Sequence, residues 1–348
     1  MIPETMRGVV FLGDRQVEVR EFPVPRPGPS EVLVEMRTAA ICGSDLHTYR
    51  RPKAQFEGMD PFIPGHEPAG VVAEIGSHVT NVKPGDRVTI YHYMACGKCQ
   101  ACHSGYLQHC EERRGLGQPV AQGPDADYIV VDARNCLHLP DALTFDDGAF
   151  IACIAGTAFS ACRKLRVNGE DIVGVFGQGP VGLTGTVILK AMGATVVGID
   201  IVDERLELAS KLGVDAVINS ATADVKQATL DLTDGRGFDA AFETSGSTVA
   251  QRAVVETLRV QGRASFVGLG SSEPSISPTA IIGRELTLMG SFVMPMGYYE
   301  DLVNLIVKHD LSPKFQHMIT HRFPIERAEE AFRVADGGRA GKVVFSWD

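Results

Sequence analysis

The chain has 348 residues, 44% of them hydrophobic and 22% charged, which is typical of a globular protein and long enough for two domains. Its formal net charge of −10 gives it no electrostatic attraction to nucleic acid or to an anionic membrane surface, so we expect its partners to be small molecules and further copies of itself. We expect no signal peptide, because the N-terminus has no uninterrupted apolar region after a basic start, and no stretch that approaches the roughly 20 apolar residues of a membrane span. We therefore expect a cytoplasmic protein with reduced cysteines.

Residues 1 to about 150 contain short apolar runs that Gly and Pro interrupt. The segments VLVEMRTAAI (32–41), GVVAEIG (70–76) and DRVTIY (86–91) have the composition of β-strands. The stretches 25–31 and 81–86 between and around them are rich in turn residues. This pattern predicts a β-rich first domain.

Two short motifs flank these strands. Cys42-Gly43-Ser44-Asp45-Leu46-His47 follows the first strand, and Gly65-His66-Glu67 precedes the second. A thiolate, an imidazole and one further ligand that leave one position open make a catalytic zinc site. Taken singly, a cysteine after a strand also fits the core and a histidine also fits the core or the surface, so these residues alone leave both interpretations open.

Four of the eight cysteines lie within the segment 96–110, in the spacing C-x2-C-x2-C-x7-C. Four thiolates so close together can surround one ion tetrahedrally and leave no position for a substrate, which is typical of a structural zinc site. An iron–sulfur cluster is the alternative metal group, and free thiols or a disulfide are the alternatives without metal. The predicted ligands of this lobe, at about 94–112, are Cys96, Cys99, Cys102 and Cys110.

From about residue 155, apolar strands alternate with helical patterns. Strands are predicted at 171–176, 195–200, 216–219, 239–244 and 263–268, and helices at 180–193, 203–213 and 249–258. Short apolar strands that are joined by crossover helices indicate a parallel sheet covered on both faces. The second domain is therefore predicted to be α/β.

The segment Gly177-Gln178-Gly179-Pro180-Val181-Gly182 is a G-x-G-x-x-G motif between a predicted strand and a predicted helix, which is the context of a dinucleotide site. Gly177 allows the tight turn, Gly179 lets the backbone approach a pyrophosphate, and Gly182 lets the helix pack on the strand. Asp200 ends the next strand, where a carboxylate can bind both hydroxyls of the adenosine ribose and repels a 2′-phosphate, which favours NAD over NADP. Asp200 could also be an ordinary loop carboxylate, and Arg205 could offset the repulsion.

The last fifty residues are predicted to form a helix over 298–309, a helix near 325–335 and a final strand over 342–347. We expect this tail to return to the first domain.

The motifs follow one another along the chain as the C-G-S-D-x-H run, the G-H-E run, the four-cysteine lobe and the G-x-G-x-x-G unit with its acidic residue. In this order they resemble the motifs of the medium-chain, zinc-containing alcohol dehydrogenases across nearly the whole chain. The resemblance implies an α/β protein in which a GroES-like, β-rich catalytic domain (1–154 and 295–348) is interrupted by a Rossmann domain with a doubly wound parallel sheet (155–294). It implies hydride transfer from a secondary alcohol or polyol to NAD, which gives the ketone or aldehyde, and two zinc ions per subunit, one catalytic and one structural. It also implies a homotetramer or homodimer, with 287–293 as a candidate pairing strand.

The resemblance assigns roles residue by residue. Cys42, His66 and Cys153 match the ligands of the catalytic zinc, and the four clustered cysteines match those of the structural zinc. Around the catalytic zinc, Glu67 matches a transient ligand, and Asp45 matches the group that orients His66. Ser44 matches the hydroxyl that binds the substrate oxygen, and His47 matches the outer end of a proton relay. The matches to cofactor contacts are Thr157, Val181, Val267 and Leu269 near the nicotinamide, Arg205 beside the adenosine ribose, and Lys342 near a phosphate.

Two departures from the family pattern affect the expected substrate. Gly43 stands where the liver-type enzymes carry an arginine for the pyrophosphate, which implies weaker cofactor binding. The C-G-S-D-x-H run resembles the polyol and threonine dehydrogenase branch, yet many polyol dehydrogenases have Glu where this chain has Cys153. An L-threonine- or sugar-acid-type dehydrogenase is therefore an alternative, in which Arg50 or Arg51 would meet a carboxylate. A non-catalytic dinucleotide-binding protein is an alternative of another class, and the retained ligands argue against it.

Overall fold

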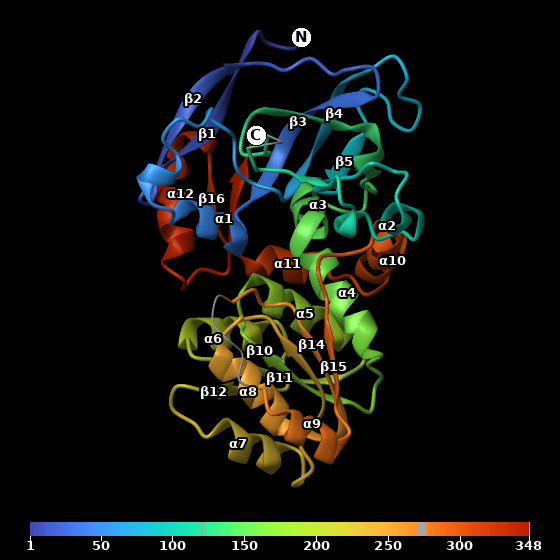
Figure 1. Cartoon of the computed structure of the whole chain (residues 1–348), viewed down its shortest axis with the longest axis vertical. Coiled ribbons are helices and arrows are strands. Elements are labelled where there is room, and N and C mark those ends of the chain that lie inside the picture. The colour runs from blue at the N-terminus through green and yellow to red at the C-terminus, as the bar shows by residue number, and fades with distance from the viewer. Residues whose placement is uncertain (120–121, 271–275, 348) are drawn as a thin grey trace. The chain divides into compact units, whose positions relative to one another are not determined.

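The structure is a computed structural model that describes residues 1–119, 122–270 and 276–347. The chain forms two compact units, and Figure 1 labels many of their elements. Unit 1 comprises Met1–Cys153, Pro295–Tyr299 and Ile319–Asp348, and unit 2 comprises Ile154–Met294 and Glu300–Met318.

The assignment of residues 300–318 differs from our expectation, which placed the whole tail in the first domain. These residues pack within unit 2 because their side chains find partners there. Asp301 forms an ion pair with Arg163, and the Sδ of Met318 accepts a hydrogen bond from the Thr184 hydroxyl at 3.8 Å. The remainder of the tail, Ile319–Asp348, does belong to unit 1.

Unit 1 is built on a seven-stranded sheet whose path is β16-β17-β3-β4-β5-β9, with β8 also paired to β3. The pairing of β3 with β4 is antiparallel and places Ala39 opposite Pro68, while the pairing of β3 with β17 places Ala40 opposite Val344. The end of β3, the start of β4 and the start of β17 therefore lie side by side. The strands of unit 1 are β1 (Thr5–Gly13), β2 (Gln16–Pro23), β3 (Glu31–Ala40), β4 (Pro68–Ile75), β5 (Arg87–Ile90), β6 (Tyr93–Met94), β7 (Arg114–Gly115), β8 (Tyr128–Asp132), β9 (Cys136–His138), β16 (Ile319–Phe323) and β17 (Lys342–Ser346).

The helices of unit 1 are short, and the main core cluster of the unit consists mainly of residues from its strands together with residues of α1 and α12. Three aromatic rings fix one of them: Tyr49 packs on Phe11 and Phe332 with centroids 5.9 and 5.4 Å away, which anchors helix α1 on β1 and α12. The helical segments are α1 (Gly43–Tyr49), η1 (Lys53–Gln55), α2 (Gln100–His103), η2 (Leu107–His109), η3 (Ala133–Asn135), α3 (Phe145–Phe150), η5 (Met296–Tyr298), η6 (Ile325–Arg327) and α12 (Ala328–Asp336).

One helical run corrects an expectation from the sequence. The run Phe145–Leu165 has 21 residues and is long and apolar enough to cross a membrane, although we expected no such stretch. It consists of α3, the π-helix η4 (Ile151–Ala155) and α4 (Gly156–Leu165). Of its most apolar window, 94% is buried inside the structure, which is the burial pattern of a core helix.

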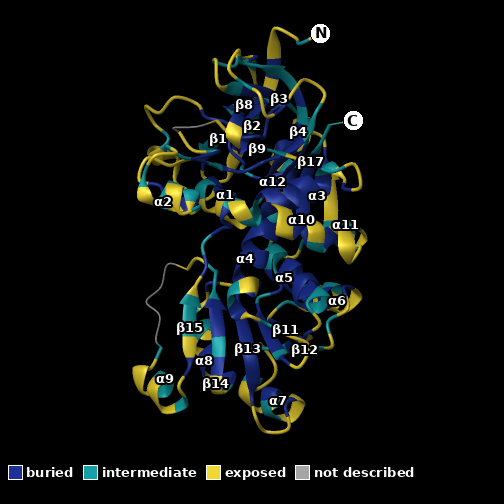
Figure 2. Cartoon of the chain, turned by 90° about the vertical axis from the view of Figure 1, so that its right-hand side faces the viewer, coloured by how far each residue is buried: buried dark blue, intermediate teal, exposed yellow. Residues whose placement is uncertain are grey.

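Unit 2 is an α/β domain with a six-stranded sheet in the order β12-β11-β10-β13-β14-β15, all parallel. Counted in chain order, the strands run 3-2-1-4-5-6, which is the order of a dinucleotide-binding doubly wound fold. Every residue of β13 is buried, as Figure 2 shows. The elements are β10 (Ile172–Phe176), α5 (Pro180–Ala191), β11 (Thr195–Asp200), α6 (Asp203–Lys211), β12 (Ala216–Asn219), α7 (Val225–Leu232), β13 (Phe238–Glu243), α8 (Thr248–Thr257), β14 (Leu258–Phe266), α9 (Pro278–Arg284), β15 (Thr287–Gly290), α10 (Tyr299–Lys308) and α11 (Ser312–Met318).

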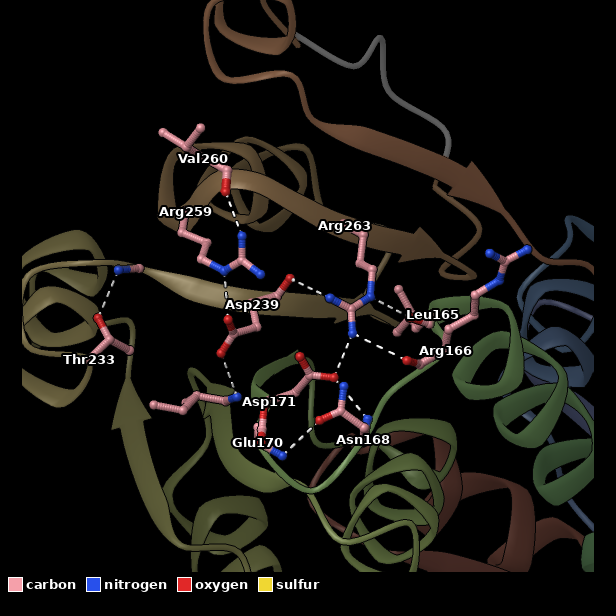
Figure 3. A network of polar contacts seen from close by, with 12 residues as sticks. Leu165, Arg166, Asn168, Glu170, Asp171, Thr233, Asp239, Arg259, Val260 and Arg263 are labelled. Atoms are coloured by element: carbon pink, nitrogen blue, oxygen red, sulfur yellow. Dashed lines mark hydrogen bonds and ion pairs between the residues drawn. The ribbon is translucent and has the colours of Figure 1, made fainter.

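A polar network closes the edge of this sheet where the strands begin (Figure 3). Asp239, near the start of β13, accepts hydrogen bonds from the backbone N–H of Ile172 at 2.8 Å and from the Arg259 guanidinium at 2.6 Å. Asp171 forms a second ion pair, with Arg263, at 2.5 Å. Burial alone would raise the pKa of Asp239, but its two hydrogen-bond donors outweigh burial and hold that pKa below the ordinary value.

Replacing Asp239 with alanine is expected to destabilise unit 2 by about 2–3 kcal/mol, because it leaves the Ile172 N–H and the Arg259 guanidinium without their acceptor. Since folding lowers the pKa of Asp239, its contribution is present at neutral pH and is lost as the pH falls below about 4. Urea denaturation at pH 7 and pH 3 measures both effects. The control is Glu330→Ala, which breaks the exposed Arg327–Glu330 pair and should cost less than about 0.5 kcal/mol. Equal effects of the two substitutions would contradict this role of Asp239.

Candidate active site

Four potential metal ligands converge in unit 1. One ligand atom from each of Cys42, His66, Glu67 and Cys153 lies within 4.8 Å of the others. Cys42 follows β3, and His66 and Glu67 directly precede β4, so the antiparallel β3–β4 pair brings them together. Cys153 comes from the π-helix η4, a rare geometry that often occurs at functional sites.

Asp45 links the two motifs that the sequence placed far apart. One carboxylate oxygen accepts a hydrogen bond from the Cys42 N–H at 2.9 Å, and the other lies 2.8 Å from Nδ1 of His66. This contact leaves Nε2 of His66 for a metal or a hydroxyl, and the Ser44 hydroxyl lies 3.3 Å from that atom. Asp45 is thus placed to fix the ring orientation of His66.

The electrostatics of this cluster are those of a site built for a cation. A hydrogen bond with Cys153 lowers the pKa of the Cys42 thiol well below its usual range, and His66 adds to this effect. The same hydrogen bond raises the pKa of Cys153, and burial acts in the same direction. Burial would lower the pKa of His66, but Asp45 and Cys42 outweigh burial and raise it. Two sulfurs and an imidazole are preferred ligands of zinc, and three protein ligands leave the position that a catalytic zinc needs.

Glu67 and Lys342 form a fully buried ion pair beside this cluster. Their charged atoms are 2.5 Å apart, and their side chains are 0% and 1% exposed. Burial raises the pKa of Glu67, and the ammonium of Lys342 opposes this rise by favouring the carboxylate. We expected Lys342 near a cofactor phosphate. Lys342 begins β17, which pairs with β3 in unit 1, and Glu67 matches its charge there. Its contact with a phosphate stays a prediction.

The four clustered cysteines also converge. The Sγ of Cys102 lies 3.9 Å from that of Cys96 and 3.5 Å from that of Cys99. The Cys96 N–H donates to the Sγ of Cys110 at 3.4 Å, and none of the four forms a disulfide. Tetrahedral zinc with Zn–S bonds of about 2.3 Å separates its sulfurs by about 3.8 Å, so the residues fit this ion. They lie around α2 and η2, between β6 and β7.

In unit 2 the glycine motif and Asp200 meet as the sequence predicted. Gly177 adopts a φ of +92°, and a Cβ on Gly182 would come within 1.8 Å of the Gly177 carbonyl oxygen. Asp200 is 6% exposed, and it accepts a hydrogen bond from the Gln178 N–H of the motif at 2.6 Å. The Arg205 guanidinium lies 3.7 Å from the same carboxylate. Helix α5 begins after Gly179 and presents its free N–H groups at this edge, which suits a pyrophosphate.

The remaining expected cofactor positions all lie in unit 2. Val181 is in the first turn of α5, and Thr157 is buried in α4. Val267 and Leu269 follow β14, at the same edge of the sheet as the glycine motif, and Leu269 is exposed.

Comparison with known proteins agrees with this geometry. Residues 28–141 match the alcohol dehydrogenase GroES-like domain, and residues 180–308 match the zinc-binding dehydrogenase domain. An L-threonine 3-dehydrogenase of Escherichia coli is 34% identical over 94% of this chain and 95% of its own length. An L-idonate 5-dehydrogenase of Vitis vinifera is 32% identical over 97% and 93%. The solved alcohol dehydrogenase TADH of Thermus sp. ATN1 superposes with a TM-score of 0.90 at 29% identity, covering 98% of this chain and 99% of that one.

The chain belongs to the zinc-type alcohol dehydrogenase family. It is therefore an oxidoreductase of the NAD-dependent zinc alcohol dehydrogenase type, with a GroES-like domain and a Rossmann-like domain. The resemblance inferred from the motifs and the fold predicted from them are both confirmed.

Sequence reasoning missed one residue beside the metal ligands of this zinc-type dehydrogenase. The ring of His92 packs edge-on against that of His66, with centroids 5.3 Å apart, and its Nδ1 lies 2.7 Å from the carbonyl oxygen of Ala152. Burial lowers the pKa of His92 to about 3, and His66 acts in the same direction. His92 is therefore a neutral imidazole at this site. The only signal in the sequence was its place directly after the predicted strand 86–91.

The structure also bears on the alternative that used Arg50. The Arg50 guanidinium forms an ion pair with Asp336 at 2.5 Å, and Arg15 pairs with the same carboxylate at 2.9 Å. Arg50 is thus already matched by a carboxylate of this dehydrogenase and gives no support to recognition of an acidic substrate.

Proposed function

We propose that this chain oxidises a secondary alcohol or polyol with NAD, with a catalytic zinc on Cys42, His66 and Cys153 and a structural zinc on the four clustered cysteines. The observation that carries the proposal is the convergence of two thiols and an imidazole within 4.8 Å of one another. When bound, zinc supplies a Lewis acid that lowers the pKa of an alcohol oxygen, and the dinucleotide supplies the hydride acceptor.

The chain's own residues would bind the alcohol and remove its proton. The Ser44 hydroxyl, 3.3 Å from Nε2 of His66, is placed to accept the proton of the substrate hydroxyl. His47 stands three residues later in α1, hence on the same face, and is exposed, so it can pass the proton to solvent. Asp45 holds His66 in one orientation during these steps.

We propose that Glu67, the carboxylate that pairs with Lys342, is a transient ligand of the metal. Its ligand atom lies within the same 4.8 Å cluster, so it can reach the metal if its ion pair opens.

In the dinucleotide site, we propose that the glycine motif and Asp200 hold the adenosine half, with Arg205 beside the ribose. Thr157, Val181, Val267 and Leu269 would line the nicotinamide.

The experiment measures metal and turnover in the same preparation. We expect two zinc ions per subunit by mass spectrometry, and NADH formation with secondary alcohols or polyols in a panel that also holds L-threonine and aldonates. The named relatives keep oxidation of a hydroxy acid as the second candidate, and faster turnover of L-threonine or an aldonate would establish it. A chain that holds both zinc ions and oxidises no compound of the panel would contradict the proposal.

Cofactor preference gives a sharper test. Asp200→Ala is expected to shift the ratio of kcat/KM for NAD over NADP by at least about tenfold toward NADP, because it removes the carboxylate that repels a 2′-phosphate while Arg205 remains. Loss of the Gln178 contact weakens both cofactors alike and cancels in the ratio. Arg205→Ala should shift the ratio in the opposite direction. An unchanged ratio in both variants would remove the pair from ribose recognition.

We further propose that the protein is cytoplasmic and forms a homotetramer or homodimer. The free cysteines support the compartment. Light scattering on the purified protein tests the assembly.

A further inference from the structure

A buried carboxylate ends the central strand of the dinucleotide-binding unit. Glu243 is the last residue of β13, its side chain is 0% exposed, and the rest of the strand is buried as well. A carboxylate without water needs hydrogen-bond donors to remain in such a place. Neither the glycine motif nor the metal site uses this residue.

The donors come from the loop that follows the strand. One oxygen of Glu243 accepts hydrogen bonds from the Ser245 N–H at 2.8 Å, the Ser245 hydroxyl at 2.6 Å and the Gly246 N–H at 2.9 Å. Burial raises the pKa of this carboxyl, against the effect of these donors. The carboxylate therefore fixes the turn at 244–246, in which Gly246 has a φ of +68°.

The same residue also holds the loop that follows β14. Its backbone carbonyl accepts from the N–H groups of Val267 at 2.9 Å and Gly268 at 3.2 Å. The two loops pack backbone to backbone: a Cβ on Gly268 would come within 2.1 Å of the Gly246 nitrogen and 2.8 Å of Oε2 of Glu243. A single residue thus ties together the loops at the ends of β13 and β14.

A third contact joins this pair of loops to the glycine motif. The N–H of Thr244 donates to the Phe176 carbonyl at 2.9 Å, and its hydroxyl lies 2.8 Å from the carbonyl oxygen of Gly177. The turn after β13 is therefore continuous with the turn that binds a pyrophosphate.

The strand order says which half of a dinucleotide these loops face. β10 lies between β11 and β13, and the cofactor of such a fold crosses the sheet edge at this switch point. Asp200, the ribose-binding carboxylate, ends β11, so the adenosine half belongs to the β11 side. The loops after β13 and β14 lie on the other side and face the nicotinamide half.

We propose that Glu243 is a positioning residue for the nicotinamide half of the cofactor: it holds the loops 244–246 and 267–268 in the shape that receives the ring. This inference rests on the proposed NAD-dependent function. Because its carboxylate is buried, Glu243 acts through these loops and does not touch the cofactor. The adenosine half has its own supports, at Asp200 and α5.

The test compares NAD with ADP-ribose, which lacks the nicotinamide, by calorimetric titration of the full chain. We expect Glu243→Ala to raise the Kd for NAD at least about tenfold and that for ADP-ribose less than about threefold, since it removes the acceptor of three hydrogen bonds. Glu243→Gln keeps an acceptor oxygen and should stay within about threefold of the wild type for both ligands. The matched control is Asp239→Ala, a buried carboxylate at the opposite end of the same strand, which should lower stability and leave both Kd values unchanged.

Gly246→Ala provides a second variant that keeps the buried charge. A Cβ there would meet the Leu269 backbone at 2.6 Å, so the loops must separate, and we expect the same selective loss of NAD binding. Equal weakening of both ligands by Glu243→Ala and Gly246→Ala, or unchanged NAD binding in either, would overturn the role of Glu243. A wild-type chain that binds neither ligand would instead overturn the proposed function, and this inference with it.

Discussion

Replacing Cys153 with alanine is expected to remove one of two zinc ions per subunit and to lower kcat/KM by at least about 10³-fold. The Lewis acid contributes several kcal/mol to the barrier, and each 1.36 kcal/mol is a factor of ten. The remaining ligands, Cys42 and His66, are too few for a three-ligand site. Metal analysis and steady-state kinetics on the same preparation check both parts.

The control is the same replacement at Cys96. It removes a ligand of the other site, which lies in the lobe around α2 and η2. We expect one zinc to be lost, a clear fall in the melting midpoint, and a kcat for the remaining folded protein within about fivefold of the wild type, because structural zinc contributes folding energy and no chemistry. If Cys153→Ala kept two zinc ions, the ligand assignment would be wrong.

Spectroscopy of a cobalt-substituted protein would also distinguish the catalytic site from the four-cysteine site. Cys153→Glu offers a carboxylate in place of the thiolate, the residue found there in many polyol dehydrogenases. We expect this variant to keep metal and to lose only part of the Co–thiolate charge-transfer absorption of the catalytic site, because Cys42 remains as its one thiolate, while the four-cysteine site keeps its own absorption.

How far the sequence predicted this site depends on how local each signal is. The four cysteines of the lobe lie in one short segment, and the glycine motif lies between a strand and a helix, so spacing alone predicts their geometry. Asp200 could be placed because it ends the next strand of the same βαβ unit. These elements are confirmed in type, with ends that differ by a few residues.

The metal cluster of unit 1 needed the resemblance, because its members come from three segments that lie far apart in the chain. Cys42 and His66 meet only through the β3–β4 pairing, and Cys153 arrives from a π-helix that no pattern indicates. The pairing of Lys342 with Glu67 likewise depends on which strand β17 joins. A charged residue at the end of an apolar strand, as at Glu243, was a signal that the sequence did contain.

Replacing Lys342 with methionine is expected to lower the melting midpoint of unit 1 by roughly 10 °C, which corresponds to about 3–5 kcal/mol for a unit of this size. The reason is the carboxylate of Glu67, which is fully buried and would lose its counter-ion. No other hydrogen-bond donor reaches that carboxylate from the residues that the structure describes. Calorimetry of the zinc-loaded protein measures the midpoint.

The double variant Glu67→Gln/Lys342→Met separates a lost charge partner from a lost side chain. It removes both charges and keeps similar volumes. Replacing both members of a buried ion pair costs far less stability than removing only one of them. We therefore expect the double variant to recover most of the stability that Lys342→Met loses. If Lys342 were instead a contact of the cofactor phosphates, the single variant would keep its melting midpoint and lose affinity for NAD and ADP-ribose alike. A midpoint within about 2 °C of the wild type would therefore contradict the ion pair as the role of Lys342.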